Sequence, residues 1–502
     1  MLFHEQSFLF IFLPVALFGI FIMNRFIPRF AVWWIVICSF VFYSFHGLQH
    51  LPLLITSISI NYFLGLIIEK NRFPNCSASL LIVGIIINLA ILAFFKYGDF
   101  ILSNLACIGM IPSQKTNIIL PLAISFFTFQ QIAYLVNLKK GEIRSSSFIN
   151  YCAFVTFFPQ LIAGPIVRYQ SIIPQIINEA WRKLSKESFW AGLCLFSFGL
   201  FKKNYFADGL RPLADSVFKA TNEGTSLSFA EAWLGSSAFG LQIYFDFSAY
   251  SEMAIGLGLL FGLKLPINFN SPYKSRNIID FWRRWHITLS EFLRDYLYKP
   301  LGGNRNGVAA GITNVLIVMA IGGLWHGASW TFVAWGGIHG VLIGFCHISR
   351  VIKKKTKYQE TNSIYCIWGS QLLTLVLVTL AWVFFRSEDF KQAFDITKSM
   401  LGFNGLDLPR FLGSSSTLDY LRFHGGLPNQ VADISLIPLF IFCLLLVLLT
   451  PNTLQILKIE NNVNSFITLP SPRVTFIAGV LLFFSVKISF ESLSYDFLYF
   501  RF

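Results

Sequence analysis

Long apolar runs are the feature that most constrains what this chain can fold into. Stretches 51–68, 79–95 and 367–385 contain no charged residue over a length that crosses a bilayer as a helix. Further runs cover 7–23, 31–48, 118–137, 189–201, 238–262, 311–321, 329–348, 435–450 and 474–490. Since backbone groups in lipid must bond within their own segment, we predict an all-α polytopic membrane protein. It would be a multi-helix bundle with roughly ten to twelve crossings, and re-entrant or interfacial helices where runs are short.

The positive charge is distributed over short loops rather than over one soluble face. The net charge of +14 would suit nucleic-acid binding, but the basic residues alternate between loops, as the positive-inside rule requires. We therefore predict no nucleic-acid partner, an N-terminus outside the cytoplasm, and contact with membrane lipid. Arg473, just before the last apolar run, favours an outside C-terminus as well. The three basic loops assigned to the cytoplasm carry Arg25 and Arg29, Lys70 and Arg72, and Lys139, Lys140 and Arg144.

No part of the sequence is polar and long enough to form a soluble domain. The least hydrophobic connection, roughly 400–432, could form a cap but is too small to fold alone. Eight cysteines are scattered without a Cys-x-x-Cys pair, so the sequence predicts neither a disulfide framework nor a metal site. We expect one integral membrane domain over 1–502, with a C-terminal aromatic motif at 497–502.

The most charged run is FWRRWHITLSEFLRDYLYKPLGGNR, residues 281–305. Wound as one helix over 280–296, it is amphipathic: Arg283, Ser290 and Arg294 form a stripe with His286 at its edge. The opposite side gathers Trp282, Trp285, Leu289, Phe292 and Tyr296. Two interpretations fit this pattern. The helix lies at the interface with its arginines on lipid phosphates, or it binds a phosphorylated ligand such as a coenzyme A thioester. The binding candidates are then Arg283, Arg284, Arg294, Lys299 and Arg305.

The second polar feature is a histidine inside an apolar, glycine-rich segment, IGGLWHGASWTFVAWGGIHG at 321–340. An ionisable residue at such a position is a functional-site hypothesis, so His326 is a candidate. Trp325 and Trp330 could wall a narrow passage beside it. The alternative is a hydrogen-bonded core histidine in a glycine-packed helix interface. We prefer that alternative for His339. It lies thirteen positions after His326, which on one helix places it on roughly the opposite face.

A third polar patch lies in GLQIYFDFSAYSEMAIG. Gln242 and Asp246 share one face at helical spacing. They support or orient the site, line an acceptor path, or satisfy one another. We favour support over direct catalysis.

These motifs together resemble a known family. DFWRRWHITLSEFLRDYLYKPLGGNR, GGLWHGASWTFVAWGGIHG, FFPQLIAGPIVRY, QIYFDFSAYSEMAIGLGLLFG and AWVFFRSEDF are similar, over about 118–390, to membrane-bound O-acyltransferases. The similarity is to the bacterial branch of alginate O-acetyltransferases and teichoic acid D-alanyltransferases. It implies a bundle thinned at its centre, with a central acyl-transfer tunnel between two funnels. It also implies that His326 occupies the essential histidine position and His286 its partner position.

The resemblance also implies a reaction. His326 would be the general base, and His286 would orient the acyl group or stabilise the oxyanion, with Trp285, Ser290, Trp325 and Trp330 near the tunnel. The donor would be cytosolic acetyl-CoA as a co-substrate, with no permanently bound cofactor, and the acceptor an exported or cell-envelope polysaccharide. The place would be the bacterial inner membrane, with a separate periplasmic serine-hydrolase-like acetyltransferase completing the transfer.

Other functions remain open on the residues alone. D-alanyl carrier protein is the alternative donor, for a teichoic-acid-like polymer. A polysaccharide or lipid-linked-sugar transporter, or a scaffold for an export complex, would use the same polar residues without acyl chemistry.

The last residues, FLYFRF, resemble the C-terminal aromatic signature of the small companion peptide of teichoic acid D-alanylation. By that resemblance Tyr499 is a candidate acyl relay, flanked by Phe497 and Phe502. The alternative is an aromatic cluster that anchors the chain at the membrane interface.

Overall fold

The computed structural model describes residues 1–45, 47–70, 74–112, 116, 118–356, 363–405, 436–460, 467–491 and 497–498. Every element of secondary structure in these ranges is a helix, which confirms the all-α prediction. Seven helical stretches are long and apolar enough to span a membrane, so the chain is a multi-pass membrane protein. They are Phe8–Phe26, Leu48–Lys70, Cys76–Cys107, Val308–His326, Trp330–Lys355, Ile364–Arg386 and Pro472–Phe490, with shorter apolar helices at Pro28–Ser44 and Leu436–Leu449.

The described residues thus contain fewer candidate spans than the ten to twelve predicted. The runs 118–137 and 189–201 give helices of only 16 residues, α5 and α9, which are short for a crossing. The run 238–262 lies in the 32-residue α11, where Asp246 and Glu252 lower the hydropathy and are buried within the protein. Apolar composition alone overcounts crossings because buried protein-facing helices are also apolar.

The contacts between residues divide the chain into two compact units, each built from separate segments. The first comprises Met1–Phe201, Ala249–Ile267 and Thr453–Asp496, and the second comprises Lys202–Ser248, Asn268–Asn452 and Phe497–Phe502. The long helix α11, Phe229–Leu260, contributes to both. The single-domain prediction over 1–502 stays a prediction, and most of the predicted cap at 400–432 lies outside the described residues.

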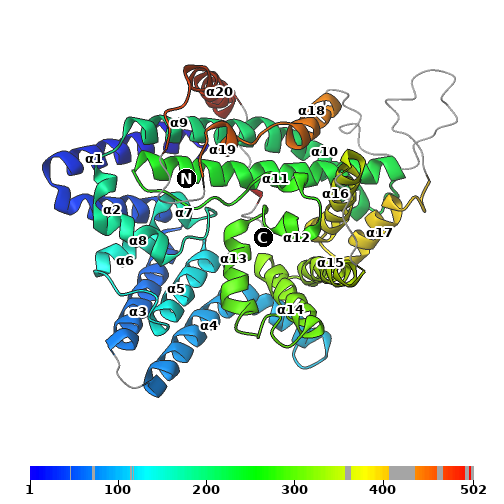
Figure 1. The fold of residues 1–502 in the computed structure, drawn as a ribbon, viewed down its shortest axis with the longest axis horizontal. Helices are drawn as coiled ribbons and strands as arrows, with labels where there is room; N and C mark the ends of the chain where they lie inside the picture. Colours follow the sequence, from blue (N-terminus) through cyan, green and yellow to red (C-terminus); the bar gives the residue numbers. More distant parts are fainter. Residues whose placement is uncertain are drawn as a thin grey trace. The chain divides into compact units, whose positions relative to one another are not determined.

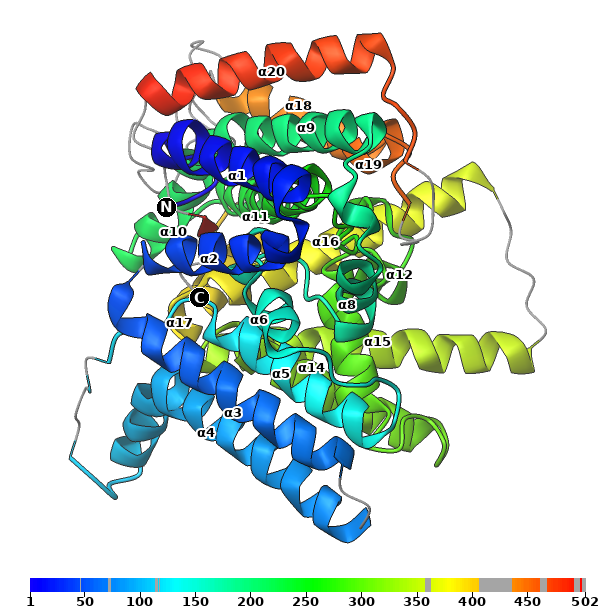
Figure 2. The same ribbon diagram turned by 90° about the vertical axis from the view of Figure 1, so that its left-hand side faces the viewer.

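The first unit is an assembly of helices around aromatic side chains. Phe3, Phe8, Phe42 and Phe158 are buried and lie ring against ring. Helix α20 packs along α9, as Figure 2 shows. Its helices are α1 Leu13–Phe26, α2 Ala31–Ser44, α3 Leu51–Lys70, α4 Pro74–Cys107, α5 Ile124–Lys139, α6 Phe148–Thr156, α7 Phe158–Leu161, α8 Tyr169–Asn178, α9 Lys186–Phe201, α19 Thr453–Ile456 and α20 Pro472–Glu491.

The second unit holds the polar motifs described above. Its helices are α10 Asp208–Asn222, α12 Ile278–Trp282, α13 Ile287–Leu293, α14 Val308–His326, α15 Trp330–Lys355, α16 Ile364–Arg386, α17 Phe390–Met400 and α18 Leu436–Leu449. Two π-helical turns, η5 Lys202–Ala207 and η7 Arg294–Tyr298, precede α10 and follow α13.

Helices α14 and α15 pack tightly against each other, and Figure 1 shows them as neighbours. A Cβ on Gly323 would overlap the carbonyl oxygen of Phe332, and one on Gly336 would overlap that of Met319. Small residues let two helix backbones approach this closely. Of the two interpretations given for the glycines near His326, the close helix interface is therefore the one that Gly323 fits.

The prediction of one continuous helix over 280–296 is wrong. Helix α12 ends at Trp282, His286 has a left-handed backbone (φ 42°), and α13 starts at Ile287. The cause is a set of tertiary hydrogen bonds. Ile287 N–H donates to the backbone oxygen of Asn268 (2.9 Å), Thr288 N–H donates to the Asn268 side chain (3.3 Å), and Asn270 N–H donates to the Arg284 oxygen (2.9 Å). These bonds replace the i to i−4 bonds that a continuous helix would make across Arg283 to Thr288.

Candidate active site

The break between α12 and α13 places His286 inside the second unit. Its side chain is fully buried, with 0% exposure. The ring lies edge-on to Phe247, with 4.8 Å between centroids, and Nδ1 is 3.0 Å from Oδ1 of Asn268. A left-handed backbone at a residue other than glycine is uncommon and recurs at functional sites.

The partners of Asn268 decide the tautomer of His286. The Asn268 atom that contacts His286 also accepts hydrogen bonds from Thr288 N–H (3.3 Å) and Thr288 Oγ1–H (2.9 Å). A backbone N–H only donates, so that atom is the amide oxygen, which only accepts. The proton of His286 is therefore on Nδ1, and Nε2 carries a lone pair.

Burial keeps this imidazole neutral. Desolvation lowers the pKa of His286 to about 3. Its Nε2 is buried and has no hydrogen-bond partner among the described residues. In this form His286 presents a hydrogen-bond acceptor to the site. It has no second N–H to offer an oxyanion, so the geometry favours an accepting role over the oxyanion role that the resemblance allowed.

The structure brings His326 close to His286. His326 is the last residue of α14, is 5% exposed, and its ring centroid lies 6.3 Å from that of His286. At this centroid distance both rings can contact one bound group. The two histidines that the resemblance paired are thus neighbours in the fold.

Aromatic rings enclose the His326 side chain. Trp325, Trp335 and Phe385 have centroids at 5.0, 5.2 and 5.4 Å from it. The indole N–H of Trp335 is buried and has no partner among the described residues. Trp330 instead lies at the start of α15 with 54% of its side chain exposed, so Trp335 takes the place beside His326 that the sequence suggested for Trp330.

A cavity of about 520 Å³ borders the helix break on the Trp282 and Ile287 side. The predicted stripe of Arg283, Ser290 and Arg294 lines it, although the helix is not continuous. Two further basic side chains line it, His347 and Arg350 of α15. Apolar residues of α14 and α15 form much of the remaining wall: Val315, Val318, Met319 and Ile343. The carboxylate of Glu291 also lines it, so the cavity combines three arginines and one acidic side chain with an apolar wall, and its lining carries an excess of positive charge.

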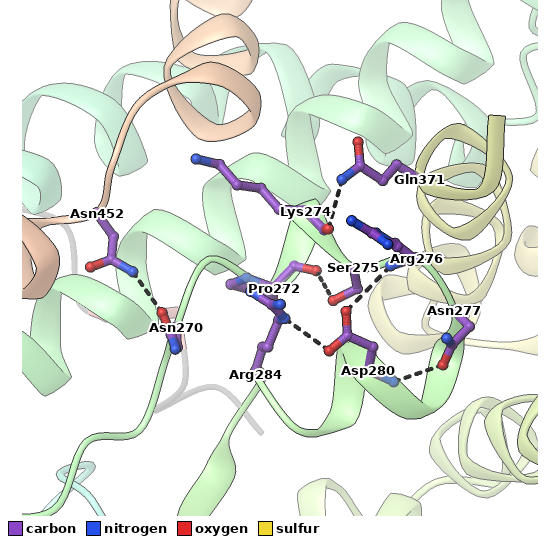
Figure 3. A network of polar contacts seen from close by, with 10 residues as sticks. All are labelled: Asn270, Pro272, Lys274, Ser275, Arg276, Asn277, Asp280, Arg284, Gln371 and Asn452. Carbon is purple, nitrogen blue, oxygen red and sulfur yellow. Dashed lines mark hydrogen bonds and ion pairs between the residues drawn. The ribbon is translucent and has the colours of Figure 1, made fainter. Parts of the chain in front are cut away.

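The other predicted donor-binding residues lie elsewhere. Figure 3 shows Arg284 in an ion pair with Asp280 (3.0 Å), within a network that also holds Asn277 and Asn270. Lys299 pairs with Asp295 (2.7 Å), and Arg305 is exposed in the following loop. None of the three lines the cavity. Arg294 also bonds Asp295 through two nitrogens, at 3.0 Å each.

The remaining predicted support residues divide into two groups. Trp285 is buried against Trp382, 4.9 Å between centroids, behind the His286 break. Gln242 and Asp246 are buried on α11, where Asp246 pairs with Lys203. Tyr499 lies outside the described residues.

Sequence reasoning missed five residues of this region: Asn268, Trp335, Phe385, His347 and Arg350. Ile343, His347 and Arg350 follow an i, i+4, i+7 spacing on one helix face, and that signal could have found the last two. His339, by contrast, fits the core interpretation preferred for it, but the continuous helix from His326 that was assumed in that argument is wrong, because α14 ends at His326 and α15 begins at Trp330. His339 is fully buried, and its Nδ1 accepts the Trp282 indole N–H at 3.3 Å.

Comparison with known proteins places this geometry in a family. The sequence model of the membrane-bound O-acyltransferase family matches residues 100–385. This chain belongs to the membrane-bound O-acyltransferase family. The matched range includes His286, His326 and every residue that lines the cationic cavity.

Individual members of the membrane-bound O-acyltransferase family are similar over most of the chain. The peptidoglycan O-acetyltransferase of Helicobacter pylori is 44% identical over 81% of this chain and 81% of its own length. The probable alginate O-acetylase AlgI of Pseudomonas aeruginosa is 38% identical over 80% of this chain and 75% of its own. The teichoic acid D-alanyltransferase of Bacillus subtilis is 27% identical over 55% of this chain and 70% of its own.

Proposed function

We propose that this membrane-bound O-acyltransferase takes acetyl groups from cytosolic acetyl-CoA and passes them outward for O-acetylation of a cell-envelope polysaccharide. The observation that carries the proposal is the buried His286–His326 pair, together with a cationic cavity that is lined by Ile287, the residue next to His286. Relatives named for peptidoglycan and alginate acetylation support acetyl as the acyl group and a polysaccharide as the final acceptor.

His326 is the proposed general base. It would remove the proton of an acceptor hydroxyl as the hydroxyl oxygen attacks the thioester carbonyl carbon. The C–S bond then breaks, and the imidazolium returns its proton to the leaving thiolate, so that an O-acyl ester and free coenzyme A result. General-base assistance of this kind contributes about 10²- to 10⁴-fold in rate.

His286 is the proposed hydrogen-bond acceptor of the site. Its bare Nε2 would orient the attacking hydroxyl or receive the N–H of His326 as that ring becomes charged. The buried indole N–H of Trp335, beside His326, is the donor available for the developing oxyanion. In this proposal His286 accepts a hydrogen bond in the site, and Trp335 donates one.

Donor recognition is assigned to the cationic cavity. Arg283, Arg294 and Arg350 supply guanidinium groups that suit phosphate oxygens, and the apolar wall suits the pantetheine arm of acetyl-CoA. Lipid phosphates would satisfy the same arginines at an interface, so charge alone does not distinguish the two ligands.

The outward half of the reaction is assigned to the C-terminal tail. Tyr499 would accept the acetyl group and present it to a separate periplasmic acetyltransferase of the serine-hydrolase kind, with the protein in the bacterial inner membrane and its N-terminus outside. Its phenol oxygen forms the ester that carries the group.

The choice of donor is tested by supplying acetyl-CoA or D-alanyl carrier protein to purified protein and measuring the thiol released. We expect release from acetyl-CoA, with a large loss in His326→Ala and none in His50→Ala, a histidine outside the site. Release only from the carrier protein would support D-alanyl transfer. Turnover of neither donor, with polysaccharide movement intact, would support a transporter.

A further inference from the structure

The C-terminal tail contacts a buried ionic cluster in the second unit. Phe497 and Leu498 are 1% and 5% exposed, so these two residues are packed inside protein. The helix that precedes them, α20, belongs to the first unit, whereas Phe497–Phe502 belongs to the second. Phe497 and Leu498 therefore pack separately from α20, inside the second unit.

The cluster is centred on Lys203. Its side chain is 1% exposed and its Nζ lies 2.7 Å from Asp208 and 2.9 Å from Asp246. Burial alone would lower the pKa of Lys203, but the carboxylates of Asp246 and Asp208 reverse this and raise it, so the ammonium stays charged. Lys203 lies in the π-helical turn η5, a feature that often marks functional positions.

The tail completes the bonding of this cluster at two points. The backbone N–H of Leu498 donates to Oδ2 of Asp246 at 2.8 Å. The ring of Phe497 covers the Lys203 ammonium, with Nζ 4.7 Å from the ring centroid. The two oxygens of Asp246 thus have separate partners: Oδ1 pairs with Lys203, and Oδ2 accepts the Leu498 N–H.

The C-terminal segment contacts the cluster through one backbone N–H, that of Leu498, and one aromatic ring, that of Phe497. Buried charges are costly unless each is paired and hydrogen-bonded, so the cluster has a preference for a segment that supplies both an N–H and a ring. Leu498 directly precedes Tyr499 in the sequence. A segment held at 497–498 restricts where the following residue can reach.

We propose that Lys203 and Asp246 form a docking site for the chain's own C-terminal segment, which is anchored there through Phe497 and Leu498. This inference adds to the proposed acetyl relay through Tyr499. The use of the docking site in acetyl transfer rests on that proposed function, but the docking itself does not.

The test measures release of the C-terminal residues from purified full-length protein by a carboxypeptidase, without any acyl donor. Asp246→Leu removes the carboxylate that holds the tail, and Asp208→Leu is the matched control, since it removes the carboxylate that does not. We expect release of Leu498 and Phe497 to be about 10- to 100-fold faster in Asp246→Leu, as expected for loss of a hydrogen bond to a charged group, and close to wild type in Asp208→Leu.

Equal release from the three proteins would overturn the docking site, whether or not acetyl transfer works. Faster release by the same factor in both variants would also overturn it, because the cluster would then matter only for folding. If either variant does not fold, Phe497→Ala decides: it leaves the cluster intact and should also speed release, and unchanged release would refute the proposal. Docking with no acetylated tail would leave this inference standing and remove the relay.

Discussion

The side-chain oxygen of Asn268 lies 3.0 Å from Nδ1 of His286 and holds the proton of a buried imidazole on that nitrogen. The same oxygen accepts two bonds from Thr288, so its orientation is fixed from both sides. Asn268 is thus a positioning residue: it acts on the site through the His286 ring.

Asn268→Leu should lower kcat by about 10- to 100-fold with little change in KM, because Nε2 of His286 is then no longer held as the acceptor. Asn268→Asp should shift the acid limb of the pH–rate profile to higher pH, since a carboxylate beside Nδ1 favours the protonated ring. Steady-state thiol release measures both. Thr288→Val keeps the amide but removes one of the two bonds from Thr288 that orient its oxygen, so it should lower kcat less than Asn268→Leu does. An acid limb at the same pH in Asn268→Asp and in the wild type would show that the protonation of His286 does not matter for this step.

Because His286 is neutral in the folded protein, the free energy of unfolding should depend on pH below about 6.5, the pKa of a free histidine side chain. Between about 6.5 and the folded-state pKa of about 3, the unfolded state binds a proton that the native state does not. This contribution to stability is therefore fully present above about 6.5 and is lost as the pH falls.

The measurement is Tm from pH 4.5 to 7.5 for wild type and His286→Asn, since asparagine tolerates the left-handed backbone. The wild type should lose more Tm on acidification than the variant. Parallel curves would mean that His286 is not buried as a neutral ring.

Arg283→Gln and Arg294→Gln should each raise the KM for the acyl donor by about 3- to 10-fold, with the effect shrinking at high salt. Both arginines line the cavity but are exposed enough to be screened. Arg305→Gln is the matched control, because Arg305 is exposed and lies outside the cavity lining. The same KM change in all three would indicate a general effect of surface charge, as the lipid-anchoring interpretation requires.

Gly323→Ala should destabilise the α14–α15 pair by about 1–3 kcal/mol, because its Cβ would meet the Phe332 carbonyl. Gly337→Ala on the same pair has open space and should be neutral or slightly stabilising. Thermal unfolding of both variants in one detergent compares them. An equal loss in the two would show that helix propensity, rather than close packing, governs this interface.

The fold class was predictable because lipid makes local composition decisive. Apolar runs such as 51–68 and 367–385 form helices, because a helix satisfies the backbone polar groups of a single segment in lipid and these runs have the length of a helical crossing. The glycines around His326 likewise left a close helix interface as one of two interpretations, and Gly323 fits it. The spacing of Arg283, Ser290 and Arg294 placed them on one face of a helix, and all three line one cavity in the structure.

The helix break at His286 was not predictable from the segment that contains it. Its cause is hydrogen bonds that Asn268 accepts and Asn270 donates, and both residues lie before α12 in a stretch without a distinctive pattern. The enclosing rings of Trp335 and Phe385 come from two different helices, and only the folded structure places both against His326. Local periodicity carries no information on such tertiary contacts.

The most direct test of the account is to incubate purified protein with isotopically labelled acetyl-CoA and to measure label on the C-terminal peptide by mass spectrometry. Wild type and His50→Ala should carry an acetyl-sized label on Tyr499, and His326→Ala should carry none. Labelling that persists in His326→Ala, or coenzyme A that is never released from acetyl-CoA by the wild type, would contradict the account.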